Sequence, residues 1–201
     1  MSDDVREPDF WNDRYATGSD GWDLGEVTPA LVDWVTETGA AGGEVIVLGA
    51  GRGYDGRWLA ARGWEVTAVD FAAAAVAEME ALATAEAPMR IMQANIFELP
   101  ADLMGRFDYV WEYTCFCAID PSQRADYADL VYRLLRPGGL WVGLVFPIGT
   151  RPGGPPFTVQ PDVVISLLGA YGLELVSRQR PVRGVEGRVG VEELVVMRKG
   201  E

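Results

Sequence analysis

The chain has 201 residues, of which 49% are apolar and 23% charged, so it is long enough for one domain with a sizeable core and leaves little room for a second. Its 30 acidic side chains against 17 basic ones give a formal net charge of −13, which disfavours binding to a phosphate backbone. The chain has no histidine, and its single lysine is Lys199, so an imidazole base is excluded and a Schiff-base lysine nearly so.

The N-terminal segment, residues 1–27, carries three aromatic side chains: Trp11, Tyr15 and Trp22. Trp11 and Tyr15 are four residues apart, which fits a helix that packs an apolar stripe on the core. Trp22 follows the turn at residues 18–21 and cannot share that stripe simply. We therefore favour an aromatic flap over a bound ligand, which would exclude water, place ring faces against a cation and offer indole N–H groups to a carboxylate.

Strands and helices alternate along the rest of the chain. Thr28 and Pro29 are the expected N-cap and first residue of a helix that ends before Gly39. Helices are expected at residues 30–38, 54–62, 71–85, 121–135 and 161–171, and the fourth of them should be stopped by Pro137-Gly138-Gly139. Strands are expected at residues 44–48, 64–70, 89–94, 107–113, 140–146, 173–180 and 191–198.

Repeated βα units with buried, β-branched strands predict a mostly parallel sheet with helices on both faces. The last two strands are joined by the loop 181–190 without a helix, so they should pair antiparallel. We therefore predict a single α/β domain over residues 1–201. Its architecture is a Rossmann-like three-layer αβα sandwich, built on a seven-stranded, mostly parallel sheet with an antiparallel C-terminal strand.

A glycine-rich turn, Gly49–Gly53, links the first expected strand to a helix. Glycine at positions 49, 51 and 53 lets the backbone turn tightly and approach a ligand, and the helix start offers free N–H groups. Asp70 ends the second strand, where a carboxylate can accept hydrogen bonds from both hydroxyls of a ribose. The spacing is G-x-G-x-G, which favours a smaller ligand than a dinucleotide. Alternatively, the glycines form an ordinary tight turn between a strand and a helix, and Asp70 is only a turn residue at the end of a strand.

The two cysteines, Cys115 and Cys117, form a C-x-C pair that matches neither a C-x-x-C redox motif nor a zinc site. We expect buried thiols in a reducing cytoplasm and no metal. The chain start lacks the regions of a secretory signal, and no apolar run approaches the ~20 residues of a membrane span. The expected partner is therefore a small molecule, with neither a membrane nor a nucleic acid involved.

Further segments occur in a distinctive order: Trp11-x-x-x-Tyr15, Trp22-Asp23-x-Gly25-x-x-Thr28-Pro29, Val47-Leu48-Gly49-Ala50-Gly51-x-Gly53, Phe116-Cys117-Ala118-Ile119-Asp120-Pro121-x-x-Arg124, Leu134-Leu135-Arg136-Pro137-Gly138-Gly139, and Pro147-Ile148 with Gly153-Gly154-Pro155-Pro156. Together they resemble the class I S-adenosylmethionine-dependent methyltransferases of the thiopurine methyltransferase superfamily. Within it, they look most like the plant-type halide/thiol methyltransferases. The resemblance runs from about residue 10 to residue 172.

This resemblance implies S-adenosylmethionine as cofactor and S-adenosylhomocysteine as product. It assigns Gly49 to the methionine part of the cofactor, Asp70 to its ribose, Asn95 and Ile96 to the adenine, and Glu112 to the cofactor's edge. The full cofactor-binding set is Trp11, Tyr15, Trp22, Gly49, Gly51, Gly53, Asp70, Phe71, Asn95, Ile96 and Glu112. Three positions depart from the family. Where this chain has Tyr15, family members often have a tryptophan, and where it has Asn95 or Glu112, they usually have an aspartate.

Candidates on the acceptor side are Tyr113, Cys117 and Arg124, and Arg124 matches an arginine that the thiopurine branch uses in substrate contact. As catalytic candidates we retain Arg124 and Tyr113. Tyr113 and Cys117 could instead be core residues, and for Cys117 we favour this alternative. Arg124 could instead be a solvated residue on a helix surface.

Methyl transfer from a sulfonium has a neutral leaving group, so the enzyme mainly positions two partners and excludes water. A site without histidine suits a nucleophile that is already anionic, and a nearby arginine raises the ionised fraction of a thiol. We therefore predict an enzyme that methylates a thiol, bisulfide or halide by in-line displacement. The alternatives are a small-molecule O- or N-methyltransferase and a non-catalytic regulator that binds S-adenosylmethionine.

Overall fold

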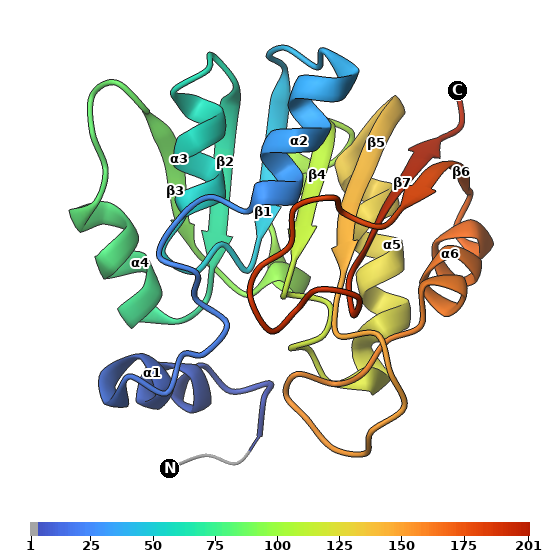
Figure 1. The fold of residues 1–201 in the computed structure, drawn as a ribbon. Helices are drawn as coiled ribbons and strands as arrows, with labels where there is room; N and C mark the ends of the chain where they lie inside the picture. The colour runs from blue at the N-terminus through green and yellow to red at the C-terminus, as the bar shows by residue number, and fades with distance from the viewer. Residues whose placement is uncertain (1–3) are drawn as a thin grey trace. The chain divides into compact units, whose positions relative to one another are not determined.

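The computed structural model describes residues 4–201, so residues 1–3 of the predicted domain and flap lie outside the described residues. Contacts between Cα atoms divide the chain into two compact units, the first ending at Leu99 and the second beginning at Pro100. We describe each unit by itself (Figure 1).

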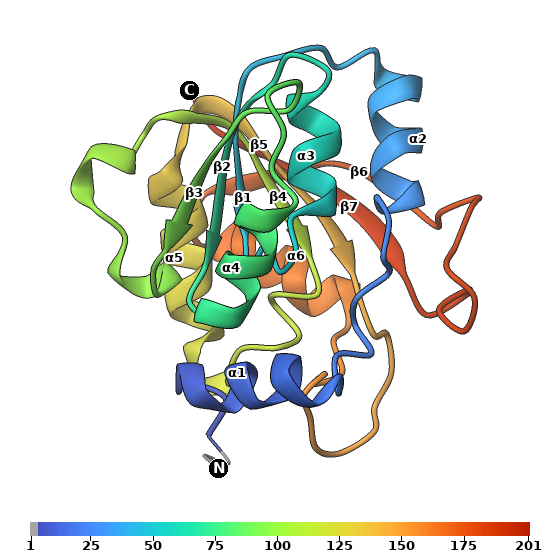
Figure 2. The ribbon, with the colours of Figure 1, turned by 90° about the vertical axis from the view of Figure 1, so that its left-hand side faces the viewer.

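The first unit holds α1 (Pro8–Thr17), α2 (Pro29–Thr38), β1 (Glu44–Leu48), α3 (Tyr54–Ala60), β2 (Glu65–Asp70), α4 (Ala73–Ala81), β3 (Met89–Gln93) and the 3-10 turn η1 (Ile96–Glu98). Strand β2 pairs in parallel with both β1 and β3. Helices α3 and α4 pack on this part of the sheet, and α1 packs on α4 (Figure 2).

The second unit holds η2 (Ala101–Leu103), β4 (Phe107–Tyr113), η3 (Pro121–Gln123), α5 (Arg124–Leu134), β5 (Leu135–Val145), α6 (Pro161–Ala170), β6 (Leu173–Gln179) and β7 (Glu193–Lys199). Strands β4 and β5 are parallel, whereas β7 runs antiparallel to both β5 and β6. Helices α5 and α6 pack on each other and on these strands.

The seven strands follow the order β3-β2-β1-β4-β5-β7-β6, with β7 as the one antiparallel strand and helices flanking the sheet. The predicted α/β fold is therefore confirmed. The apolar runs explain the strands, because a parallel strand covered by helices is buried on both faces: Val45 to Leu48 of β1 are each at most 5% exposed. Within residues 4–201, no helix is long and apolar enough to cross a membrane.

Two helix boundaries differ from the sequence prediction for identifiable reasons. Helix α4 begins at Ala73 rather than residue 71, because the Asp70 carboxylate accepts the N–H of Ala72 and holds that residue in an extended conformation. It ends at Ala81, four residues before the expected end at residue 85. Thr28 is the N-cap residue of α2 as predicted, but its side chain does not cap the helix and instead donates to Asp55.

The junction between α5 and β5 also differs from the prediction. The helix ends at Leu134 and the strand begins at once with Leu135, which pairs with Phe107 of β4. Pro137, Gly138 and Gly139 therefore do not stop the helix but lie within the strand, where the pairing register shifts. A bulge of this kind accommodates a proline that lacks an N–H for the ladder.

Candidate functional site

The glycine turn lies at the carboxyl end of β1, and its backbone requires glycine. Gly49, Gly51 and Gly53 have φ angles of 61°, 55° and 72°, in the left-handed region that side chains disfavour. A Cβ atom on Gly53 would lie 2.7 Å from Cγ of Met79, and one on Gly51 would lie 3.2 Å from the Tyr15 hydroxyl. The turn is therefore a cradle of bare backbone, and its contact with a ligand stays a prediction.

Asp70, at the end of the neighbouring strand β2, braces this cradle. One carboxylate oxygen accepts the N–H of Gly51 at 2.9 Å, and the other accepts the N–H of Ala72 at 2.9 Å. The side chain is buried, and this burial raises its pKa although backbone hydrogen bonds from Gly51, Phe71 and Ala72 oppose the change. Each carboxylate oxygen has a second lone pair, so Asp70 can hold the turn and still accept hydrogen bonds from a ligand.

The three N-terminal aromatic residues gather beside the cradle. The ring centroids of Trp11 and Trp22 are 5.4 Å apart and those of Tyr15 and Trp22 are 5.5 Å apart, both edge-to-face. Tyr15 is 8% exposed and packs on Ala72 and Ala75. The helix α1 and the later Trp22 thus form one cluster, although sequence spacing alone suggested that Trp22 stands apart.

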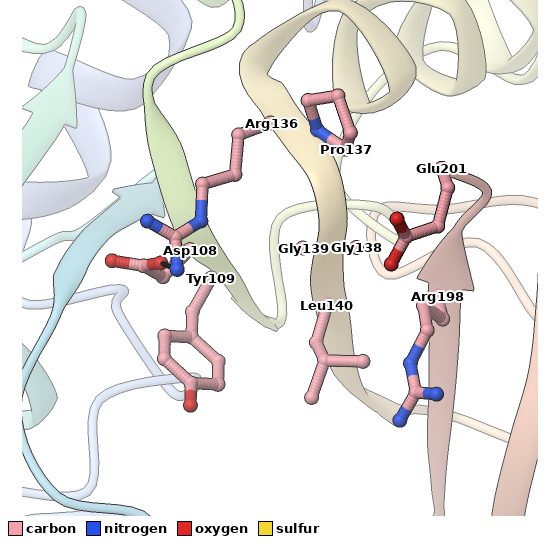
Figure 3. A pocket seen from close by; sticks show the side chains of 9 residues that line it. All are labelled: Asp108, Tyr109, Arg136, Pro137, Gly138, Gly139, Leu140, Arg198 and Glu201. Carbon is pink, nitrogen blue, oxygen red and sulfur yellow. Dashed lines mark ion pairs between the residues drawn. The ribbon is translucent and has the colours of Figure 1, made fainter.

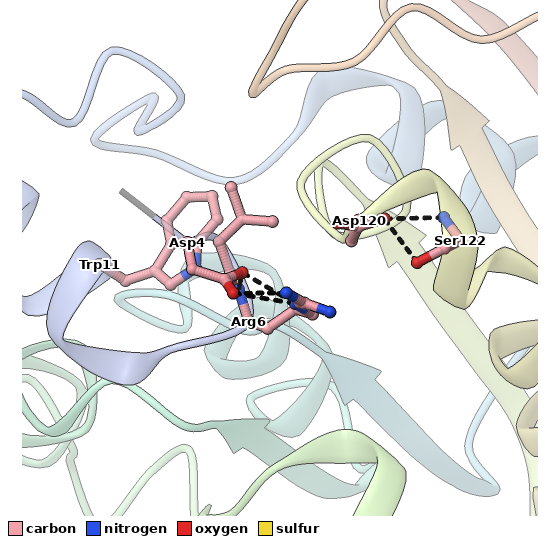
Figure 4. A network of polar contacts seen from close by, with 6 residues as sticks. Asp4, Arg6, Trp11, Asp120 and Ser122 are labelled. Atoms are coloured by element: carbon pink, nitrogen blue, oxygen red, sulfur yellow. Dashed lines mark hydrogen bonds and ion pairs between the residues drawn. The ribbon is translucent and has the colours of Figure 1, made fainter. Parts of the chain in front are cut away.

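The indole N–H groups of the cluster are engaged inside the protein. The N–H of Trp11 donates to the carbonyl of Val5 at 2.8 Å, next to the ion pair of Arg6 with Asp4 (Figure 4). Trp22 donates a hydrogen bond to the Tyr15 hydroxyl. In this conformation the rings offer their faces and edges, and the binding of a carboxylate by their N–H groups stays a prediction.

The other predicted cofactor residues of the first unit follow β2 and β3. Phe71 is half-buried and packs against the aromatic cluster. Asn95 is half-buried, and its side-chain oxygen accepts the N–H of Phe97 at 3.1 Å, which fixes the turn η1. Ile96 is 8% exposed. Because β2 and β3 are parallel, these residues lie at the same sheet edge as Asp70 and the glycine turn.

In the second unit, Glu112 at the end of β4 holds a strained turn. One oxygen accepts the N–H groups of Cys115 and Phe116, at 3.1 and 2.8 Å, and the other accepts the hydroxyl of Tyr127 at 2.8 Å. Thr114, inside the turn, has a φ of 64°, which is unfavourable for a β-branched residue. Burial raises the pKa of Glu112 to about 7 despite these hydrogen bonds. Its contacts give it a structural role, and its predicted place at the cofactor's edge stays a prediction.

We expect Glu112→Gln to change how stability depends on pH. The folded state holds the Glu112 proton more tightly than the unfolded state, so this group lowers the free energy of unfolding as pH rises from about 4.5 to about 7. The slope is at most ~1.4 kcal/mol per pH unit. Glutamine does not titrate, so urea unfolding at pH 5 and pH 8 should show a smaller loss of stability in the variant. The same slope in both proteins would contradict the prediction, and Glu174→Gln, at an exposed site, is the control.

A chain of buried polar groups lies beside this turn. Arg188, from the loop before β7, donates to the Tyr113 hydroxyl at 2.5 Å, and the hydroxyl in turn lies 2.5 Å from Glu192. All three side chains are at most 9% exposed, and the guanidinium lies over the Phe146 ring at 4.8 Å. Burial, with the charge of Glu192, raises the pKa of Tyr113, so its hydroxyl stays protonated.

Arg124 begins α5, after a turn that Asp120 fixes by accepting the N–H and hydroxyl of Ser122, at 2.8 and 2.7 Å (Figure 4). Its guanidinium lies over the Phe116 ring at 4.9 Å, and the side chain is half-buried rather than solvated. Its Nε is buried and has no hydrogen-bond partner among residues 4–201. A cation with an unused donor is equipped to hold an anion.

Cys117 is 2% exposed, and burial, with the charge of Glu112, raises its pKa well above the usual range. It is a core thiol, as the favoured interpretation held. The charges of Arg188 and Arg124 oppose this rise in the pKa of Cys117. Sequence reasoning singled out Arg124 but neither Arg188 nor Glu192, because both lie beyond residue 172, where the family resemblance ends.

A pocket of about 300 Å³ also occurs in the second unit, near the start of β4 and β5 (Figure 3). Its lining includes Asp108 and Arg136, which form an ion pair, together with Tyr109 and Arg198. It contains none of the predicted site residues. No cluster of at least three histidine, cysteine, aspartate or glutamate side chains that could hold a metal occurs among residues 4–201.

The chain is similar in sequence to several known proteins. The family model for thiopurine S-methyltransferase matches residues 6–194. The probable thiol methyltransferase 2 of Arabidopsis thaliana is 31% identical over 188 residues, which cover 92% of this chain and 82% of the relative. Thiocyanate methyltransferase 1 of Brassica oleracea is 30% identical over 189 residues, with the same coverage. Thiopurine S-methyltransferase of Pseudomonas fluorescens is 32% identical over 180 residues, with 81% and 82% covered.

Solved structures agree with the fold. The 1,6-didemethyltoxoflavin-N1-methyltransferase of Burkholderia thailandensis, with bound 1,6-didemethyltoxoflavin and S-adenosylhomocysteine, has a TM-score of 0.74 at 26% identity and covers 96% of this chain and 87% of its own. The magnesium protoporphyrin IX methyltransferase of Synechocystis, with bound S-adenosylhomocysteine, has a TM-score of 0.74 at 16% identity over 96% and 99% of the two chains. The second likeness concerns the fold alone.

Proposed function

The chain belongs to the thiopurine S-methyltransferase family and is an S-adenosylmethionine-dependent methyltransferase, and we propose that its acceptor is a small soft nucleophile: a thiol, bisulfide or halide. The observation that carries the proposal is the pair of partly or fully buried arginines, Arg124 and Arg188, in a chain without histidine. Such a site can attract an anion but offers no imidazole to deprotonate an alcohol. Relatives named as thiol and thiocyanate methyltransferases support this choice.

The first unit fits the cofactor. S-adenosylmethionine supplies an electrophilic methyl group on a positively charged sulfur and carries a ribose, an adenine and a carboxylate. In the proposal the cofactor lies against the bare backbone of the turn Gly49–Gly53, whose left-handed φ angles disfavour side chains. In the proposal Asp70 accepts hydrogen bonds from the ribose hydroxyls, and Asn95 and Ile96 contact the adenine. Trp11, Tyr15 and Trp22 cover the cofactor, with residues 1–27 as a flap of the single domain 1–201.

The second unit supplies the acceptor side of the proposal. Arg188 and Arg124 attract an anionic acceptor and stabilise a thiolate against its thiol. Tyr113 is held by Arg188 and Glu192, so its hydroxyl has a fixed position. The apolar rings of Phe116 and Phe146 exclude water from the guanidinium groups that lie over them, which strengthens their charge toward an acceptor.

The same proposal places the protein in the cytoplasm. Cys115 and Cys117 are buried thiols outside any disulfide bond, which suits a reducing compartment. The net charge of −13 disfavours nucleic acid as a partner.

We expect the purified protein to form methanethiol from bisulfide, or methyl iodide from iodide, when it is given S-adenosylmethionine. Both nucleophiles carry their own charge and need no general base, so turnover should persist at neutral pH. Gas chromatography of the headspace measures both products, and a reaction without protein measures the uncatalysed background.

If neither bisulfide nor iodide gives a methylated product, the proposed acceptor class is contradicted. Turnover of a small alcohol or amine would then favour the alternative O- or N-methyltransferase, an activity type that the Burkholderia structure exemplifies. Tight binding of S-adenosylhomocysteine without any turnover would favour the non-catalytic regulator.

A further inference from the structure

We propose that Arg52 is a positioning residue: an ion-pair latch that fastens the segment 19–25 of the flap to the glycine turn and thereby holds the cofactor side of the site closed. The proposal goes beyond the family resemblance, in which this position is an unspecified residue of the turn. Its link to the cofactor rests on the proposed role of the turn and the flap.

Arg52 contacts three carboxylates from two other segments of the first unit. Its Nη1 binds Asp23 and lies 2.7 Å from Asp20, both in the flap, while its Nε binds Glu78 on α4. Its guanidinium also lies 5.2 Å from the centroid of the Tyr15 ring, which itself packs on Trp22. One side chain thus joins the turn, the flap and α4.

The ion pairs of Arg52 with Asp20 and Asp23 are better shielded from water than ordinary surface pairs, whereas Glu78 is 43% exposed. The side chains of Arg52, Asp20 and Asp23 are 17%, 19% and 15% exposed. Exposed pairs contribute little because solvent screens them, as expected for Arg133 with Asp129, which are 49% and 47% exposed. Hydrogen bonds between charged groups at partly buried sites are stronger and hold a defined geometry.

The turn needs such a support, because Arg52 lies between two left-handed glycines. Gly51 and Gly53 restrict the backbone little, so the sequence alone leaves the direction of the turn open. Asp70 holds one side of the turn through the N–H of Gly51, and Arg52 holds the side that faces the flap. Loss of the latch should therefore loosen both the turn and the flap.

A chain of contacts lets one backbone amide report on the latch. Asp23 binds Arg52 through Oδ2 and accepts the N–H of Gly25 through Oδ1 at 2.6 Å. By contrast, the N–H of Ala74 donates to Asn12 of α1 at 3.1 Å and reports on the docking of α1 against α4. Hydrogen exchange at these two amides separates opening of the latch from general unfolding of the unit.

The test is Arg52→Met in the full chain, with hydrogen exchange followed by NMR and S-adenosylhomocysteine binding followed by calorimetry. We expect exchange at Gly25 to be about tenfold faster while exchange at Ala74 stays as in the wild type, because the variant leaves Asp20, Asp23 and Glu78 without their shared cation. Binding of S-adenosylhomocysteine should weaken about tenfold. Arg52→Lys should be intermediate, since one ammonium cannot replace the planar fork.

Arg133→Met, which removes an exposed arginine of α5, is the matched control and should change neither readout. Asp23→Asn should weaken binding less in the Arg52→Met background than in the wild type, as expected for groups that act together. Unchanged exchange at Gly25 would overturn the latch, and faster exchange with unchanged binding would overturn its role toward the cofactor. If the wild type binds no S-adenosylhomocysteine, the proposed cofactor role of the turn fails, while the exchange data still decide whether the latch exists.

Discussion

Asp70→Ala should weaken the binding of S-adenosylhomocysteine by about a hundredfold or more. The variant loses the proposed acceptor of the ribose hydroxyls and also the brace on Gly51 and Ala72, and each hydrogen bond to a charged group contributes ~1.5–3 kcal/mol. Isothermal titration calorimetry measures the loss. An affinity equal to that of the wild type would show that Asp70 does not bind the ribose.

A cofactor analogue separates the two roles of Asp70. Removal of both ribose hydroxyls, as in a 2′,3′-dideoxy analogue of S-adenosylhomocysteine, should weaken binding to the wild type but should cost the Asp70→Ala variant almost nothing further. If the analogue binds more weakly than S-adenosylhomocysteine by the same factor in the wild type and in the variant, Asp70 acts only as a brace of the turn. Asp108→Ala, which removes the carboxylate paired with Arg136, is the matched control and should leave the affinity unchanged.

Arg188→Met should lower kcat/KM for bisulfide or iodide by about 10- to 100-fold while the affinity for S-adenosylhomocysteine stays within about twofold. One charge-assisted contact to an anion accounts for a loss of this size. The variant also leaves Glu192 without the cation whose charge lowers its pKa, although burial raises that pKa overall. Steady-state kinetics with each acceptor, together with calorimetry, measure the two effects.

The double variant Arg188→Met/Glu192→Gln tests the electrostatic cause. Removal of the Glu192 charge should recover part of the lost kcat/KM, because an anionic acceptor then meets no uncompensated carboxylate. Arg178→Met is the control, since Arg178 pairs with Asp162 and Glu193 at an exposed site. An Arg188→Met variant with unchanged kcat/KM for both anions would show that Arg188 does not contact the acceptor.

The absence of histidine and the surplus of acidic residues both bear on how an anionic acceptor reaches the site. A protein with a net charge of −13 repels an anionic acceptor over most of its surface, so local positive charge must guide the acceptor. Sequence reasoning found one source, Arg124, at a motif position. Arg188 comes from a loop of ordinary composition, and only the fold brings it to the Tyr113 hydroxyl, 75 residues away in sequence.

The element order was predictable because it depends on local patterns. Short runs rich in β-branched or aromatic residues predict strands, and two of them, Glu44–Leu48 and Phe107–Tyr113, have the expected bounds. The errors occur where long-range contacts outweigh local preference. The Asp70 carboxylate delays the start of α4, and pairing of Leu135 with Phe107 draws Pro137 into a strand.

The fold, the family and the glycine turn with Asp70 therefore follow from the sequence alone, since each depends on residues close together in the chain or on a motif of fixed spacing. The tertiary structure alone decided which charges meet. Arg52 joins Asp20, Asp23 and Glu78, Glu112 supports the turn at Thr114, and Arg188 pairs with Tyr113 and Glu192. The sequence around a charged side chain does not indicate which other charge it will pair with. The effect of that charge on the site depends on its burial and on distances, which are fixed only when the chain is packed.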